Sequence, residues 1–345
     1  MNLGPVLILT ALLCLGLACS GDSTPSPTAA VPTPTAPVEA TTRPEVTATR
    51  EATTAPPRAT PTATSPSATR SPLRTSTATP RPDGLEFHFG PGVSDFDRSL
   101  IMRAVEVTGE MLSAGAEVRP PTAVFADASP QGLEQAFAEE ALAQQWRAQG
   151  MAQRMTQALA EASYRGFVIN TGNPAWLQMD ATERLRVVAH EFVHVIQLEQ
   201  SGREVADATF LAPAGQVPPM GPFWLLEGSA EVVSWMVLQE LGLGSYAESL
   251  FDYAADAAAA DVELEELSSF IGLHGDGSEG LGLAVLATDY LLRSRSLDAL
   301  FDFWREIGDG AEWSSAFTRE FGQPPAFFYI AFATYYENTW AGFSP

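Results

Sequence analysis

The chain has 345 residues, of which 42 are acidic and 19 basic, and its formal net charge at pH 7 is -23. All the basic residues are arginine, since the chain contains no lysine. A surface this acidic repels phosphate groups, which excludes nucleic acids and anionic lipid surfaces as partners bound through charge. Both cysteines, Cys14 and Cys19, lie near the N-terminus, so the rest of the chain can form no internal disulfide.

The first 19 residues have the pattern of an export leader. Val6–Ala18 is apolar but too short to span a bilayer with ease. It runs into G-L-A-C-S at 16–20, which resembles the lipobox of bacterial lipoproteins and implies that Cys19 is lipidated and becomes the new N-terminus. Ordinary signal cleavage and an uncleaved anchor are the alternatives, and all three export the protein. We therefore expect an outward-facing membrane lipoprotein or a secreted protein, with membrane contact only through a lipid anchor.

Residues 20–82 have a different composition from the rest of the chain. Threonine, proline, alanine and serine dominate there, and no aromatic residue occurs. Such a segment cannot bury enough apolar area to offset the entropy lost on ordering, which predicts a disordered stalk. The chain thus divides into a leader at 1–19, a stalk at 20–82 and a folded domain at 83–345, long enough for one large domain or two lobes.

Hydrophobic periodicity predicts the elements of the folded domain. Strands are expected at Leu85–Phe89, Thr122–Ala126 and Gly166–Asn170, and helices at Phe96–Ala114 and Pro130–Ala162, the latter as one long or two shorter helices. Beyond Gly242 every predicted element is a helix. Aromatic residues at helical spacing in this part are expected in the core: Phe301, Phe303, Trp304, Trp313, Phe317, Phe321, Phe327, Phe328, Tyr335 and Tyr336. His88, between two phenylalanines, is interpreted as structural.

A helix whose start Asp180 or Thr182 could cap carries the motif H-E-x-x-H at 190–194. His190 and His194 are four residues apart, so both imidazoles leave the same helix face and can bind one zinc ion at about 2.0–2.1 Å. Glu191 lies beside the metal rather than on it. A carboxylate there can take a proton from a water molecule that the metal activates, which is the role of a general base.

A second helix is expected from Pro222 to Gly242 and contains the motif E-G-x-A-E at 227–231. Glu227 and Glu231 are again four residues apart, and apolar residues flank both. Burying two carboxylates requires a cation or a donor for each. Zinc would satisfy Glu227, and the outer N–H of a zinc-bound histidine would satisfy Glu231. A solvated acidic face is the alternative.

The two motifs together, H-E-F-V-H and W-L-L-E-G-S-A-E, resemble those of the gluzincin metallopeptidases, the thermolysin-like clan, and most closely its small peptidase-MA-like bacterial members. The resemblance implies that His190, His194 and Glu227 bind zinc, that Glu191 is the catalytic base and that Glu231 supports a histidine. It also implies an α+β, zincin-like fold, in which a small mixed sheet and the active-site helix form an N-terminal lobe beside a mostly helical C-terminal lobe. By the same analogy, the strand at Gly166–Asn170 is expected to border the cleft and pair with an extended substrate.

Two features depart from the family pattern. The chain lacks a G-x-M-E-N strand, which in gluzincin aminopeptidases grips the substrate amine, so that type of exopeptidase activity is not expected. It also lacks the tyrosine that in those enzymes stabilises the oxyanion before a helix like Gly282–Leu291. His274, in a glycine-rich loop, is the best substitute as a donor to the oxyanion. The alternative is that His274 is a surface loop residue with no catalytic role.

The sequence therefore predicts an exported zinc metallopeptidase that acts on peptide or protein substrates, and we expect it to be an endopeptidase. The first alternative is a cell-surface binding module that holds zinc for structure and catalyses no reaction. The second is a stalked adhesin whose motif is vestigial. A catalytic site keeps an open coordination position, whereas structural sites are closed and favour cysteine. The substrate's identity and the oligomeric state do not follow from the sequence.

Overall fold

The computed structural model describes residues 84–112, 122–140, 143–148, 150–202, 217–260, 262–269 and 279–340. Three predicted features lie outside these ranges: the leader with Cys19, the stalk at 20–82, and His274. All the described residues belong to one compact unit of the chain.

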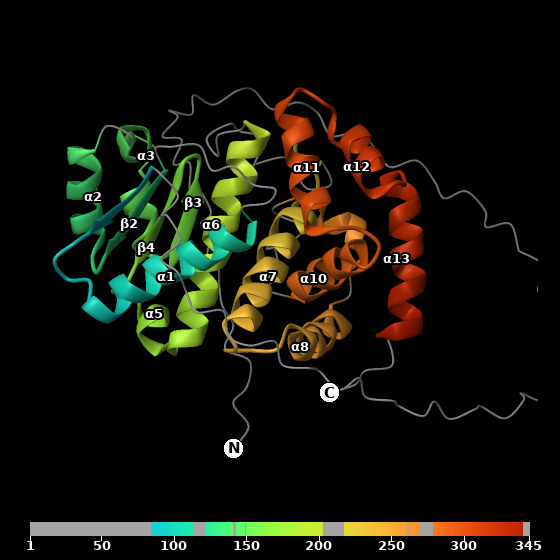
Figure 1. Cartoon of the computed structure of the whole chain (residues 1–345), viewed down its shortest axis with the longest axis horizontal. Helices are drawn as coiled ribbons and strands as arrows, with labels where there is room; N and C mark the ends of the chain where they lie inside the picture. The colour runs from blue at the N-terminus through green and yellow to red at the C-terminus, as the bar shows by residue number, and fades with distance from the viewer. Residues whose placement is uncertain are drawn as a thin grey trace, which may run out of the picture. The chain divides into compact units, whose positions relative to one another are not determined.

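The described chain is mostly helical and contains one small sheet (Figure 1). Its strands are β1 (Leu85–Phe89), β2 (Thr122–Asp127), β3 (Ala160–Ser163) and β4 (Gly166–Asn170). The helices of the sheet-bearing part are α1 (Asp95–Leu112), α2 (Pro130–Glu139), α3 (Gln144–Ala148), α4 (Met151–Arg154), α5 (Pro174–Gln178) and α6 (Ala181–Ser201). The later helices are α7 (Phe223–Glu240), α8 (Tyr246–Ala259), the 3-10 helix η3 (Leu264–Ser268), α10 (Glu279–Leu292), α11 (Leu297–Gly308), α12 (Trp313–Phe321) and α13 (Pro325–Thr339). This is the mixed α and β content that the sequence predicted.

The sheet has the strand order β1-β2-β4-β3; β2, β3 and β4 are buried throughout, whereas β1 is only partly buried. β1, β2 and β4 run parallel, and β3 pairs antiparallel with β4. Side chains alternate along β2: Val124 and Ala126 join the core that contains α1 and α6, whereas Ala123 and Phe125 join the core formed with α2, α3 and α4. A strand that is buried on both faces has a continuous apolar sequence, as T-A-V-F-A does.

Helix α6 links the sheet to the helical part of the molecule. It contacts α1, β3 and β4, and on other sides α7 and α11. Phe192 packs near Phe167 of β4, with 6.3 Å between the ring centroids. Almost every side chain from Leu185 to Leu198 is buried, including polar ones, so α6 is covered all round rather than on one stripe.

Two sequence predictions for the sheet were wrong. The segment Pro130–Ala162 forms three short helices and then strand β3, because Gly150 adopts a left-handed conformation (φ 69°) and the A-E-A-S segment pairs with β4. In addition, Gly166–Asn170 is an inner strand with a neighbour on each side, so it cannot pair with a substrate. The strand at that end of the sheet is β3.

The helices beyond α7 form an aromatic core, as predicted for most of its members. Phe301, Phe303, Trp304, Phe317, Phe321 and Phe328 are buried, and Trp313, Tyr335 and Tyr336 are partly buried. Phe327 is the exception: it is 66% exposed, on the outer side of α13. Across the described ranges, no helix combines the length and the hydropathy that crossing a membrane requires.

Candidate metal centre

The two motif helices begin and pack as their sequences dictate. Asp180 caps α6 through a capping box with Glu183, which fixes where the helix starts. In α7, Gly228 follows the motif glutamate and faces α10. A Cβ at that position would lie 2.4 Å from the carbonyl oxygen of Ala284, so only glycine permits this approach of the two helices.

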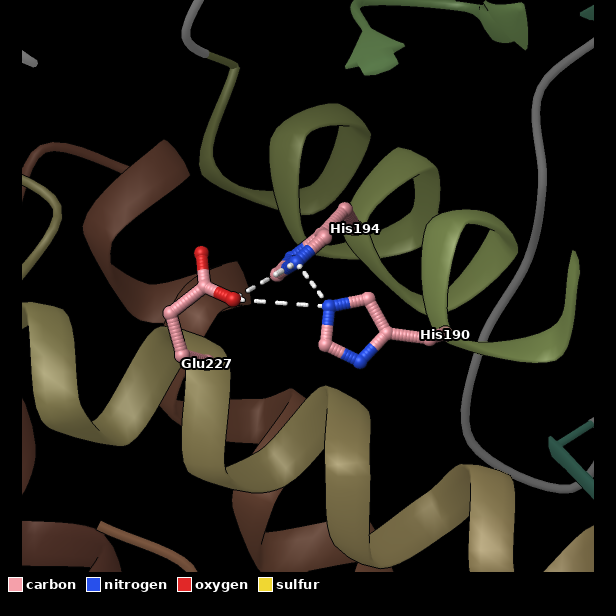
Figure 2. Close-up of side chains that lie close together, drawn as sticks. All are labelled: His190, His194 and Glu227. Atoms are coloured by element: carbon pink, nitrogen blue, oxygen red, sulfur yellow. Dashed lines mark hydrogen bonds and ion pairs between the residues drawn. The ribbon is translucent and has the colours of Figure 1, made fainter. Parts of the chain in front are cut away.

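His190, His194 and Glu227 converge at the contact between α6 and α7 (Figure 2). The two Nε2 atoms are 3.0 Å apart, and each is 3.4 Å from Oε2 of Glu227. None of the three residues is more than 6% exposed. The predicted cluster is thus present and buried, and its three ligand atoms can contact one metal ion.

The outer nitrogens of the two histidines have different partners. Nδ1 of His190 is 2.9 Å from Oε2 of Glu231, the contact that the sequence predicted. Nδ1 of His194 is 2.7 Å from Oε1 of Gln197. The amide nitrogen of Gln197 donates to the carbonyl oxygen of Leu226 (3.1 Å) and to Oγ of Ser229 (2.8 Å), which fixes Oε1 as the acceptor.

These partners determine where the histidine protons lie. Ionised Glu231 and the amide oxygen of Gln197 are acceptors, so each Nδ1 carries the hydrogen. Each neutral imidazole then directs the lone pair of Nε2 at the other imidazole and at Glu227. Three acceptor atoms 3.0–3.4 Å apart, shielded from water, need a shared cation or proton.

Glu231 lies at the centre of a buried ionic network. Its second oxygen, Oε1, accepts hydrogen bonds from Arg186 of α6 and from the hydroxyl of Tyr253 of α8. Arg186 also lies over the ring of Trp235 at 5.5 Å, and the indole of Trp235 donates to Tyr253 (2.9 Å). Burial alone would raise the pKa of Glu231, but Arg186 and His190 lower it to about 2, so this carboxylate remains charged.

The buried charges of the centre do not balance when every carboxylate is ionised and no cation is bound. When all groups are ionised, Arg186 contributes one positive charge and Glu191, Glu227 and Glu231 one negative charge each. Burial opposes a proton on His190, but hydrogen bonds to Glu227 and Glu231 raise its pKa to about 10. Burial likewise works against ionisation of Glu227, but the two histidines hold its pKa well below the usual range. A divalent metal ion would replace this proton and neutralise the cluster.

Glu191 lines a small cavity together with the metal-ligand candidate His190 and with Glu231. The space open to the centre of a water molecule is about 10 Å³, room for about one water. Leu159, Ala160, Arg186, Val187, His190, Glu191 and Glu231 line it. Burial raises the pKa of Glu191, and the nearby histidines partly oppose this shift. A carboxylate with a raised pKa beside space for one water is suited to exchanging protons with that water.

A second cluster, Glu86, His88 and Glu140, lies on the other side of the sheet. The His88 ring stacks on Phe125 with 4.5 Å between centroids, and its nitrogens are 3.6 and 3.4 Å from the two carboxylates. Both carboxylates are more than a third exposed as side chains, unlike those of the metal centre. The stacking agrees with the structural interpretation of His88.

The sequence analysis identified the ligand set but missed part of its surroundings. It did not single out Gln197, Arg186 or Tyr253. Gln197 and Arg186 were detectable in principle, because both lie on the α6 face that carries the two histidines. Tyr253 was not, since nothing in the sequence brings α8 to Glu231.

Comparison with known proteins adds no relative: no protein-family model matches the chain, and no curated protein or solved structure is significantly similar to it. The function is therefore inferred from the geometry of the site and from the motifs.

Proposed function

We propose that this protein is an exported zinc metallopeptidase of the gluzincin type, which hydrolyses peptide bonds in peptide or protein substrates. The observation that carries the proposal is the convergence of His190, His194 and Glu227, with Glu191 on the next position of the same helix. A small sheet whose end strand is antiparallel and contacts the metal helix is compatible with a zincin-like fold.

Zinc fits the donor set better than calcium or magnesium. Ligands placed tetrahedrally about 2.0–2.1 Å from an ion are about 3.3–3.4 Å apart, and the observed separations are 3.0, 3.4 and 3.4 Å. Two imidazoles and one carboxylate leave a fourth position free, as in catalytic zinc sites. Calcium and magnesium prefer sites built from oxygen alone.

In the proposed reaction a zinc ion, when bound, would polarise the scissile carbonyl and lower the pKa of a water molecule. Glu191 takes the proton of this water at its carboxylate and passes it to the leaving amine. Glu231 and Gln197 hold the imidazoles of His190 and His194 in the tautomer that leaves Nε2 free to bind. The remaining step assigned from the sequence, donation to the oxyanion by His274, stays a prediction.

The proposal also assigns a different strand to substrate pairing. β3 begins beside the cavity at Ala160 and ends the sheet, so an extended substrate would pair with β3 rather than with Gly166–Asn170. Export, and lipidation at Cys19, are proposed from the leader alone.

A zinc-containing binding module without turnover is the second candidate. The burial of the ligand set, none of which exceeds 6% exposure, favours it, because a catalytic centre must admit a substrate. Glu191 supports the peptidase over the binding module, since a binding module has no use for a base beside the water cavity.

The test measures zinc content and peptide cleavage side by side. Glu191→Gln should keep zinc and lose cleavage by about 100-fold or more, since an amide cannot take the proton. His190→Ala, His194→Ala and Glu227→Ala should each lose zinc as well. Glu199→Gln, a buried glutamate on the same helix outside the cluster, is the matched control and should retain both. If the wild type holds zinc but cleaves no peptide, the binding module becomes the better assignment. If Glu191→Gln cleaves as fast as the wild type, Glu191 is not the base and this site is not the proposed peptidase.

A further inference from the structure

A groove separate from the metal centre lies between α13, the end of α8 and the segment that leads into η3. Its volume is about 700 Å³, within the range of sites that bind small molecules or peptide segments. The buried side chains of Leu264, Leu283 and Phe332 contribute to its apolar lining. None of the metal-centre residues lines it.

One continuous face of α13 forms a wall of this groove. Residues three or four positions apart lie on the same face of a helix. The residues of α13 that line the groove have this spacing: Ala326, Tyr329, Ile330, Ala333, Tyr336 and Glu337. At 1.5 Å per residue the wall is about 16 Å long. The opposite wall is built from small side chains, Ala257, Ala258 and Ala260, which leave the groove wide.

Helix α13 is apolar on both of its sides, but only one side is covered. Phe328 is buried and stacks on Trp224 with 5.4 Å between centroids. On the outer side, Phe327 is 66% and Ile330 67% exposed. A helix that is apolar all round is normally buried, and adjoining exposed apolar side chains mark interaction sites. The outer side of α13 therefore lacks a partner within the described chain.

The charges beside the groove all have one sign. Glu263 and Glu265 line one wall and Glu337 the other, and all three are exposed. Among the described lining residues there is no arginine or histidine, and in the described part of the chain no ion pair neutralises any of the three. A ligand with positive charge next to apolar groups complements such a surface.

We propose that this groove binds a short basic peptide segment with side chains of leucine or phenylalanine size. A wall about 16 Å long accommodates about five extended residues at about 3.3 Å each. Alternate side chains of an extended peptide would enter the apolar floor, and the arginine or lysine residues between them would face the glutamates. The site uses no residue of the metal centre, so it goes beyond the proposed peptidase activity and stands whether or not that centre turns over.

The test is binding of a fluorescein-labelled peptide of alternating arginine and leucine to the full chain, followed by fluorescence anisotropy. The same peptide with glutamate in place of arginine should bind at least 10-fold more weakly. Ala333→Trp, which fills the groove from the α13 wall, should reduce affinity for the arginine peptide at least 10-fold. Ala258→Trp, which fills the groove from the opposite wall, should have the same effect and replaces Ala333→Trp if that variant does not fold.

Charge reversal in the groove is compared with charge reversal elsewhere. Glu337→Arg should weaken binding about 2- to 5-fold, the effect of one exposed charge. Glu248→Arg, at an exposed position on α8 away from the groove, should leave affinity unchanged, which separates the groove from general attraction to an acidic protein. Equal binding of the two peptides, or of a neutral amphiphile as tightly as the arginine peptide, would overturn the proposal, as would wild-type affinity in both tryptophan variants.

Discussion

Replacing Gln197 by methionine tests whether a neutral amide positions one of the metal ligands. Gln197 is fully buried and makes three contacts, to Nδ1 of His194, to the carbonyl of Leu226 and to Oγ of Ser229. Methionine has nearly the same length and volume, so the substitution removes the hydrogen bonds without opening a large cavity.

The expected losses of unfolding free energy and of zinc affinity depend on which groups lose their only hydrogen-bond partner. The Ser229 hydroxyl, which lies 2.6 Å from the Leu225 carbonyl and 3.0 Å from the Leu226 carbonyl, keeps a donor within reach of the Leu226 carbonyl. The Nδ1–H of His194 loses its acceptor in a buried site, which costs about 1–3 kcal/mol of unfolding free energy. The imidazole is also no longer held in the tautomer that leaves Nε2 free, so zinc affinity should fall about 10- to 100-fold.

Two measurements separate positioning from general stability. Zinc affinity is measured by chelator competition, and the unfolding free energy of the metal-free protein by urea denaturation. Gln197→Glu keeps the acceptor for His194 but buries a charge and loses both donated hydrogen bonds, so it should be less stable than the wild type yet bind zinc at least as tightly. The reasoning is refuted if Gln197→Met binds zinc with wild-type affinity, or if Gln197→Glu loses zinc to the same extent as Gln197→Met.

Three further predictions follow from the same site. Glu231→Gln should weaken zinc affinity about 10- to 100-fold in chelator competition while the protein stays folded; unchanged affinity would make Glu231 irrelevant to His190. Gly228→Ala should lower the unfolding free energy measured in urea, because overpacking against Ala284 costs about 1–3 kcal/mol and better helix propensity returns about 1 kcal/mol; a gain in stability would contradict the close approach of α7 and α10. Zinc binding at pH 7 should release about one proton, since His190, with a pKa of about 10, is protonated in the metal-free protein and must lose that proton to bind. At a pH above this pKa, zinc binding should release no proton. Titration calorimetry in buffers of different ionisation enthalpy measures the number of protons released, and a binding enthalpy at pH 7 that is the same in all buffers would contradict the assignment.

Local sequence was enough to predict most elements but not the end strand of the sheet. The strands at Leu85–Phe89 and Gly166–Asn170, and the start of α6 at its Asp180 cap, are confirmed. Strand β3 was missed because Ala160–Ser163 consists of residues that favour helices or turns, and its extended form depends on pairing with β4. Phe327 was misplaced because helical spacing identifies an apolar residue but does not say which side of α13 is covered.

In the metal centre, too, features within one helix could be predicted from the sequence, whereas contacts between helices could not be derived from helix spacing. The spacing of four residues brings His190 and His194 to one face of α6 from sequence alone. Their approach to Glu227 was inferred from the cost of burying the E-G-x-A-E carboxylates and from the resemblance, and the distances are consistent with it. The acceptor for His194 could not be chosen in advance, because the orientation of Gln197 depends on Leu226 and Ser229 of a different helix.

The polar stripe along α6 has a consequence for how the two helices align during folding. Polar residues of α6 and α7 pair in antiparallel order. Arg186 and His190 contact Glu231, His194 contacts Glu227, and Gln197 contacts the Leu226 carbonyl and Ser229. Sliding one helix by a turn, about 5.4 Å, would bury charges without partners at a cost of several kcal/mol each. An apolar contact would tolerate such sliding far better. The alignment is therefore selected by pairs between protein groups, so the chain can reach it before any metal arrives.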